Sequence, residues 1–309
     1  MGAVDLPACA DHVSCLLFSP CVFLPAPTTA AALLDLTDPN EPDQLAKLRA
    51  LVNAHWRGDA MRKALRKVQN SHENATYLRS NEWVQYWLDE CDRVLAEGYL
   101  PTSEDMLKLR RPTNGEQVLQ FTMRKQAFEL VDLGGQTHEM KSWAHHMEQD
   151  IAGVVFMLSL ADFDKRDTHG HWASAWSRAS STDEVRSTNR LEEGLQVLND
   201  ILRSTPALQV LPLVIMLNKV DLFEDRIKRG KKFHRYFDAC PREFGRNALK
   251  ARQWLVKEVS APTDNRFFSA PHGKMTCFST CATDSSQAEK MIDNVFDAVL
   301  MNNMETLGI

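Results

Sequence analysis

The segment Val131-Asp-Leu-Gly-Gly-Gln136 decides the fold, because it joins an apolar strand to a turn suited to phosphate and Mg²⁺. The apolar run 128–131 leads into it, and residues 137–147 could form a helix after it. An aspartate at the end of a strand can reach the water shell of a metal ion. The glycines allow a ligand to approach the backbone closely, and the glutamine amide can orient a water molecule. By itself the segment is also compatible with an ordinary strand that ends in a Gly-Gly turn.

Two further strand ends carry polar groups. The apolar run 213–217 ends in Asn218-Lys-Val-Asp221, and the strand-like run 275–279 ends in Thr280-Cys-Ala-Thr283. A carboxylate and an amide at this spacing can read the edge of guanine, and a lysine stem can lie over the ring. Because a doubly wound sheet binds its ligand at the carboxyl ends of its strands, the three ends predict one α/β nucleotide site.

These motifs resemble the α subunits of heterotrimeric G proteins. The matching segments are 132–136, 218–223 and 280–284, and the segment 99–113 resembles the first switch of that family. The resemblance covers roughly residues 45–309. It implies an α/β fold, with a doubly wound Ras-like nucleotide-binding domain and part of an all-α helical domain.

The resemblance also implies a role for individual residues. Arg110 would be the arginine finger and Gln136 would orient the attacking water, as the two catalytic residues. Thr113 would bind Mg²⁺ directly and Asp132 through the metal's water shell. The implied nucleotide-binding residues are Leu107, Lys108, Leu109, Arg110, Arg111, Pro112, Thr113, Asp132, Leu133, Gly134, Gly135, Gln136, Asn218, Lys219, Val220, Asp221 and Ala282.

The implied function is that of a GTP-binding and GTP-hydrolysing signal transducer at the cytoplasmic face of the plasma membrane. Its ligands would be GTP or GDP with Mg²⁺, and its partners a βγ dimer, a G protein-coupled receptor and an effector, with peripheral membrane association. The net charge of −5 gives no general attraction to nucleic acid. The 7 cysteines have no metal-ligand spacing and indicate reduced thiols. No apolar run is long enough for a spanning helix.

The chain is expected to divide into a divergent, poorly ordered segment 1–40, a partial helical domain 41–108 and a Ras-like domain 109–309. In the helical part, Thr102 is expected to cap a short helix with Asp105 three residues later. A helical apolar face is formed by Val84, Trp87, Leu88, Cys91 and Leu95.

The Ras-like part is expected to contain a hairpin over 117–131, a buried strand over 153–160 and a polar loop insertion over 164–190. Trp143 is expected to pack the second-switch segment against the sheet. The basic, aromatic segment 229–240 reads as a solvated loop. Helices are expected over 191–202, over 242–259 and from Ser286 onward, the last with a buried stripe of Ile292, Val295, Phe296 and Val299.

The chain departs from the family at the phosphate loop. The pattern G-x-x-x-x-G-K-[ST] occurs nowhere in it, and the first strand of the family, which would lie at the centre of the sheet, has no counterpart. Several charge-assisted bonds of about 1.5–3 kcal/mol each would be lost. Either the run 13–18 acts as a substitute strand, or the chain is a shortened product of a longer gene.

Two other function classes remain open, and the first of them rests on this departure. One is a protein of the same fold that has lost its affinity for nucleotide and acts as a scaffold or decoy. The other is a small-molecule enzyme on a doubly wound sheet, for which no redox or acyl-transfer motif is present.

Overall fold

The computed structural model describes residues 42–70, 83–109, 116–134, 143, 146, 151–165, 189–261, 265, 267–268 and 275–307. The chain separates into two compact units, residues 1–111 and 112–309. The division into a divergent segment (1–40), a partial helical domain (41–108) and a Ras-like domain (109–309) stays a prediction. Among the described residues, no helix combines the length and the apolar character needed to span a membrane.

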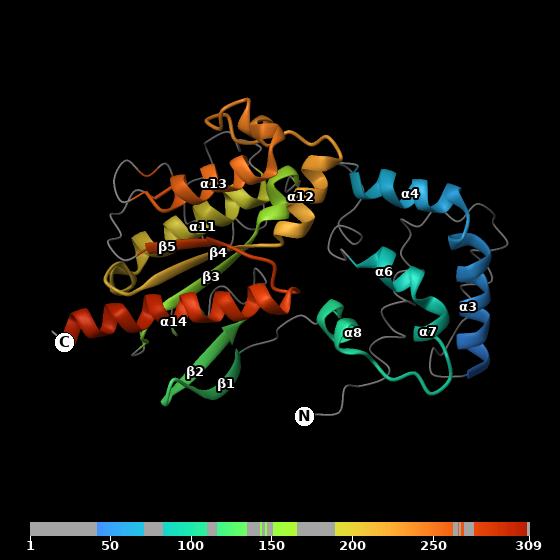
Figure 1. Cartoon of the computed structure of the whole chain (residues 1–309), viewed down its shortest axis with the longest axis horizontal. Helices are drawn as coiled ribbons and strands as arrows, with labels where there is room; N and C mark the ends of the chain where they lie inside the picture. Colours follow the sequence, from blue (N-terminus) through green and yellow to red (C-terminus); the bar gives the residue numbers. More distant parts are fainter. Residues whose placement is uncertain are drawn as a thin grey trace. The chain divides into compact units, whose positions relative to one another are not determined.

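The first unit is all-helical in its described part (Figure 1). Its helices are α3 (Pro42–Trp56), α4 (Asp59–Asn70), α6 (Val84–Asp89), α7 (Cys91–Val94) and α8 (Ser103–Lys108). They share one core, in which Trp87 is completely buried between Leu48, Val52 and Trp56. The predicted apolar face is confirmed, but it lies on two short helices, because Glu90 leaves the helical conformation between α6 and α7.

A hairpin opens the second unit, as predicted. Strands β1 (Glu116–Met123) and β2 (Gln126–Leu133) pair antiparallel. The turn residues Arg124 and Lys125 both have positive φ, +49° and +66°, the conformation whose twist matches that of the strands. The hairpin packs on α14 (Ser285–Leu307), where the rings of Phe121 and Phe128 contact Phe296.

A parallel sheet forms the centre of the second unit. It consists of β3 (Val154–Ser159), β4 (Leu213–Asn218) and β5 (Met275–Ser279), in the order β3-β4-β5. The connecting helices are α11 (Arg190–Ser204), α12 (Val220–Lys228) and α13 (Ala248–Val259) (Figure 1). Strand β4 is apolar and buried along residues 213–217, as expected for a central parallel strand. This arrangement confirms the predicted α/β class.

The described strands form two separate sheets, because β2 and β3 do not pair with each other. The predicted strand over 153–160 is present, but the expectation that it is fully buried was wrong. Val155 is 38% exposed and Met157 53% exposed, because β3 lies at the edge of its sheet and these side chains point away from the covered face. The proposed substitute strand, 13–18, lies outside the described residues.

Three other expectations need correction. The segment 229–240 is not a solvated loop, since Phe233, Phe237 and Cys240 are buried. Phe233 stacks on Phe237 and contacts Phe163 and Phe223, so aromatic packing folds this basic segment onto the core. Helix α13 begins at residue 248 rather than 242, because Asn247 caps it. On α14, Ile292 is exposed and only Phe296 of the predicted stripe is fully buried.

Candidate functional site

Two of the predicted loops are joined by hydrogen bonds at the carboxyl edge of the parallel sheet. The side-chain Oδ1 of Asn218 accepts from the backbone N–H of Lys219 at 2.8 Å and of Ala282 at 3.0 Å. The backbone N–H of Val220 donates to the carbonyl of Thr280 at 3.2 Å. The loops 218–221 and 280–283 therefore form one structure. The amide Nδ2 of Asn218 donates to a weak acceptor, Met157 Sδ, at 3.6 Å.

Lys219 adopts a left-handed backbone conformation, with φ 66° and ψ 44°, immediately before α12. Such a conformation costs a non-glycine residue about 1–2 kcal/mol. The bond from Asn218 Oδ1 to its N–H holds it there. Backbone outliers of this kind occur preferentially at functional sites, and this one turns the chain between the predicted base-reading residues Asn218 and Asp221.

Asp221 lies exposed in the first turn of α12. A carboxylate is favoured there by the helix dipole, so the structural role and the predicted base-reading role are compatible. Asp284 fixes the other loop, because its Oδ1 accepts from the backbone N–H of Ser286 at 3.0 Å and of Gln287 at 3.2 Å. The hydrogen bonds from Gln287 and Ser286 keep the pKa of Asp284 below its usual range.

The end of β3 supplies charged residues that the sequence analysis missed. Asp162, in the short helix η1 (Leu160–Asp164), pairs with Lys165 at 2.6 Å. Burial disfavours its ionised form, but Lys165, Lys219 and Arg226 together lower its pKa. Asp164 pairs with Arg226 at 2.6 Å. The signal in the sequence was the acidic pair directly after a strand, the same pattern that identified Asp132.

Two buried hydroxyl groups flank Asn218 and have no hydrogen-bond partner among the residues that the structure describes, namely Ser159 Oγ at the end of β3 and Thr280 Oγ1 after β5. Buried polar groups are normally satisfied. Unpaired hydroxyl groups on both sides of the candidate base-reading residue are what a site for a polar ligand would leave in its absence, so the residues present fit a nucleotide base.

The end of β2 places Asp132, Leu133 and Gly134 in sequence, with Asp132 exposed and Gly134 buried. The indole Nε1 of Trp143 donates to the carbonyl of Gly134 at 2.9 Å. Its ring contacts Phe156 of β3 edge-on, with 6.1 Å between centroids. The predicted packing of Trp143 against the sheet is confirmed. Gly135 and Gln136 lie outside the described residues.

Arg110, Arg111, Pro112 and Thr113 also lie outside the described residues. The three predicted contacts before them belong to the first unit. Leu107 is exposed, and Leu109 packs partly against the helical core. Lys108 pairs with Glu104, and its Nζ lies over the rings of Tyr86, at 3.7 Å, and Trp83, at 5.0 Å. The side chain of Lys108 is therefore held within its own unit.

A buried carboxylate anchors α8, the helix that precedes these residues. Thr102 and Asp105 form the predicted capping box. Asp105 also accepts from Tyr86 Oη at 2.6 Å and from both terminal guanidinium nitrogens of Arg93 at 2.7 Å. Burial is the largest cause that raises the pKa of Tyr86 to about 12, and the hydrogen bond to Asp105 is the next largest.

The geometry thus joins two of the four predicted loops, 218–221 and 280–283. In the segment 132–134, the carbonyl of Gly134 accepts the bond from Trp143. Among the described residues, no cluster of three or more His, Cys, Asp or Glu side chains suits a metal ion. For Mg²⁺, the described residues supply Asp132, whose carboxylate is exposed at a strand end.

Comparison with known proteins gives one consistent result. A family model described as G-protein alpha subunit matches residues 27–299. The guanine nucleotide-binding protein alpha-16 subunit of Caenorhabditis elegans is 27% identical over 281 residues, which are 91% of this chain and 71% of that protein. The guanine nucleotide-binding protein G(o) subunit alpha of Lymnaea stagnalis is 27% identical over 245 residues, 78% of this chain and 61% of that protein. The chain thus spans less than two thirds of the G(o) relative.

Proposed function

Because this chain belongs to the G-protein alpha subunit family, we propose that it binds GTP and GDP and acts as a GTP-hydrolysing signal transducer. The observation that supports this most strongly is the pair of bonds from Asn218 Oδ1 to the N–H groups of Lys219 and Ala282. They unite the two predicted base-reading loops into one polar edge.

Each residue of this edge has a chemical role in the proposal. The Asp221 carboxylate accepts from the ring N–H and amino group of guanine. The Asn218 amide faces the base, and the stem of Lys219 lies over the ring. The N–H of Ala282 already donates to Asn218, so a contact with the guanine carbonyl oxygen would require this N–H to be shared or released.

In the proposed hydrolysis, Gln136 orients the attacking water and Arg110 stabilises the charge that develops on the phosphates, an arginine that Gα subunits supply from the same chain. Mg²⁺, when bound by Thr113 and through water by Asp132, would neutralise phosphate charge. We place the protein at the cytoplasmic face of the plasma membrane, with a βγ dimer, a receptor and an effector as partners.

Nucleotide titration of the whole chain tests the proposal. We expect a fluorescent GDP analogue to bind with micromolar or higher affinity in the presence of Mg²⁺. Asn218→Ala should weaken binding at least about tenfold, because two loops lose their shared acceptor. Asn247→Ala is the matched control, since Asn247 also accepts a backbone N–H, that of Lys250 at 3.0 Å, but in the cap of α13.

Absence of binding at millimolar protein would contradict the proposal and favour the scaffold reading, which rests on the missing G-x-x-x-x-G-K-[ST] pattern. Equal weakening by both asparagine variants would show that Asn218 acts through stability alone.

A further inference from the structure

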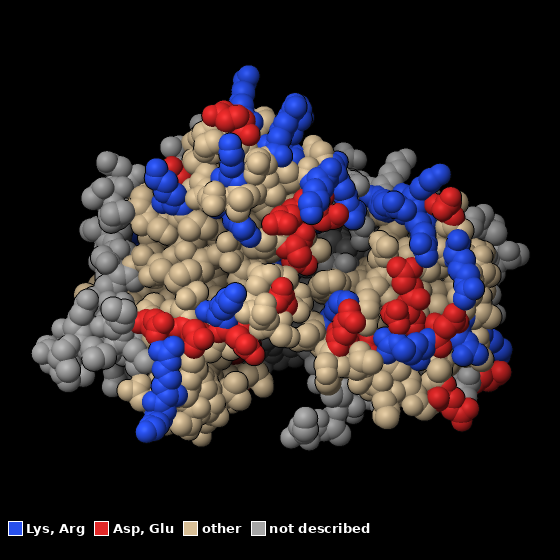
Figure 2. All heavy atoms as spheres, in the orientation of Figure 1, with Lys and Arg blue, Asp and Glu red and all other residues tan. Residues whose placement is uncertain are grey.

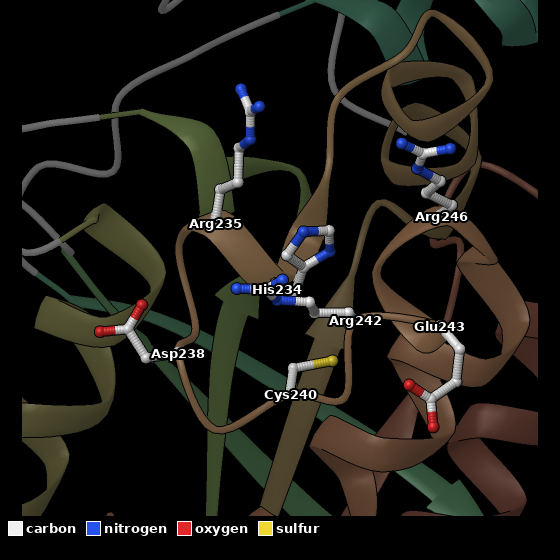
Figure 3. A pocket seen from close by; sticks show the side chains of 7 residues that line it. All are labelled: His234, Arg235, Asp238, Cys240, Arg242, Glu243 and Arg246. Atoms are coloured by element: carbon white, nitrogen blue, oxygen red, sulfur yellow. The ribbon is translucent and has the colours of Figure 1, made fainter.

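A basic pocket lies on the second unit, on the segment between α12 and α13. Its volume is about 990 Å³, at the upper end of the range typical of small-molecule sites. Figure 2 shows lysine and arginine side chains gathered on the part of the surface where Figure 1 places this segment. The charged and imidazole groups that line the pocket are those of His234, Arg235, Asp238, Arg242, Glu243 and Arg246 (Figure 3).

The pocket has a rigid base. Phe233 and Phe237 are buried and stack with 4.6 Å between ring centroids, and Phe237 also contacts Trp254 of α13. His234 packs directly onto Gly245, where a Cβ atom would come within 2.0 Å of the imidazole Nδ1. Glycine at position 245 is therefore required for this placement of the ring. Core packing, rather than a loose loop, sets the positions of the basic groups.

Three arginines line the pocket against two carboxylates, those of Asp238 and Glu243. No ion pair joins Arg235, Arg242 or Arg246 to any residue that the structure describes, whereas the nearby Arg226 and Arg229 pair with Asp164 and Asp225. In Figure 3 the guanidinium of Arg242 lies beside the imidazole of His234, and the carboxylates of Asp238 and Glu243 point away from it. Unpaired arginines in a concave site create a local potential that attracts anions.

The neighbouring ionisable groups respond to this potential. The guanidinium groups of Arg246 and Arg235 lower the pKa of Lys232. Burial, and then the charges of Arg242, Lys232, Arg235 and Arg246, lower the pKa of His234. Its Nδ1 is buried without a hydrogen-bond partner. These causes disfavour the charged form of the imidazole, and a bound anion would favour it.

We propose that this pocket binds a ligand that carries two or more phosphate groups. The planar fork of arginine matches the oxygens of phosphate, and charge-assisted bonds of this kind are strong. Three guanidinium groups at separate positions, in a volume larger than one phosphate fills, favour more than one phosphate. The ligand is either a soluble polyphosphorylated molecule or the headgroup of a phospholipid. The site is independent of the proposed nucleotide edge.

Calorimetric titration of the whole chain with inositol trisphosphate, without added nucleotide, tests the soluble source. Flotation with phosphatidylcholine vesicles, with and without phosphatidylinositol bisphosphate, tests the lipid source. We expect binding in at least one arm and a loss of about tenfold for each of Arg242→Gln and Arg246→Gln. Arg229→Gln removes the same charge from a paired arginine outside the pocket and should leave binding unchanged.

A second readout distinguishes a specific site from general attraction. On binding, the imidazole resonances of His234 should titrate at a higher pH. A bound polyanion offsets the positive charges that lower the pKa of His234, those of Arg242, Lys232, Arg235 and Arg246. The two carboxylates of the pocket, Asp238 and Glu243, do not offset all four of these charges. Binding in neither arm, equal losses in the Arg229 control, or binding of a phosphorylated peptide alone would each overturn the proposal.

Discussion

Replacing Asp105 with alanine should loosen the helix that leads into the predicted switch arginine, Arg110. The Asp105 carboxylate is completely buried. It accepts from Tyr86 Oη at 2.6 Å, from two nitrogens of Arg93 at 2.7 Å, and from the backbone N–H and hydroxyl of Thr102 at 2.8 Å. One side chain therefore ties α6, α7 and the start of α8 together.

The magnitude follows from the groups that the substitution would leave unpaired. The Tyr86 hydroxyl and the Thr102 amide would each lose an acceptor, at about 1–2 kcal/mol apiece. The Arg93 side chain is 37% exposed and keeps Glu90 at 2.8 Å, so water can hydrate it and its cost is smaller. We expect the free energy of local unfolding to fall by about 3 kcal/mol, which is at the lower end of the range for a broken buried ion pair. This change raises the equilibrium constant for local opening roughly a hundredfold.

Amide hydrogen exchange over residues 84–108 measures this opening without involving the second unit. The control is Asp92→Ala in the same unit, because Asp92 is exposed and its pair with Arg57, at 2.8 Å, is a surface pair of about 0–1 kcal/mol. Equal exchange rates in the Asp105 and Asp92 variants would refute the reasoning.

The pH dependence gives an independent check. The hydrogen bonds from Arg93, opposed by burial and aided by Tyr86 and Thr102, hold the pKa of Asp105 well below its usual range. A lowered pKa in the folded state stabilises the fold above the unfolded pKa of about 3.9 and loses that effect as the pH falls below it. The difference between wild type and Asp105→Ala should be complete at neutral pH and shrink below about pH 4.

Three other predictions concern the proposed catalytic residues, a buried thiol and the segment 13–18. Arg110→Cys and Gln136→Leu should each slow single-turnover GTP hydrolysis by about a hundredfold or more with little loss of GTP binding; unchanged rates would remove both residues from the mechanism. The thiol of Cys277, whose pKa burial raises to about 12, should react with thiol reagents at pH 8 only after unfolding, and rapid labelling of the native protein would contradict its burial. If residues 13–18 act as the substitute strand, their amides should exchange as slowly as those of β4, and fast exchange would exclude this strand.

The sequence predicted strand β4 and the position of the polar loop after it well, because local pattern determines both. Strand β4 is buried on both faces, so its sequence is an unbroken apolar run. The end of this run marks the end of the strand and the start of the polar loop that follows it. The Thr102–Asp105 capping box was predictable for the same reason, since its hydrogen bonds join residues three apart.

Elements whose environment depends on distant neighbours could not be predicted in this way. The segment 229–240 looked solvated because its basic residues outnumber its aromatic ones, yet Phe233 and Phe237 meet Phe163 and Trp254 from far along the chain. Likewise, Met157 reads as a core residue in an apolar strand. It is exposed because β3 lies at a sheet edge, a property of the topology rather than of the strand.

The distribution of hydrogen bonds at the candidate site bears on how a chain without the Gly-Lys-[ST] loop could still recognise a base. Asn218 uses its carbonyl oxygen to hold the backbone N–H groups of Lys219 and Ala282. In the proposed nucleotide site, the loops 218–221 and 280–283 are thus shaped by contacts within the sheet edge itself. Preorganisation lowers the entropy cost of binding, but it adds no charge that could hold a phosphate. If the proposed function holds, we therefore expect recognition of the base and affinity for the phosphates to be separable in this chain.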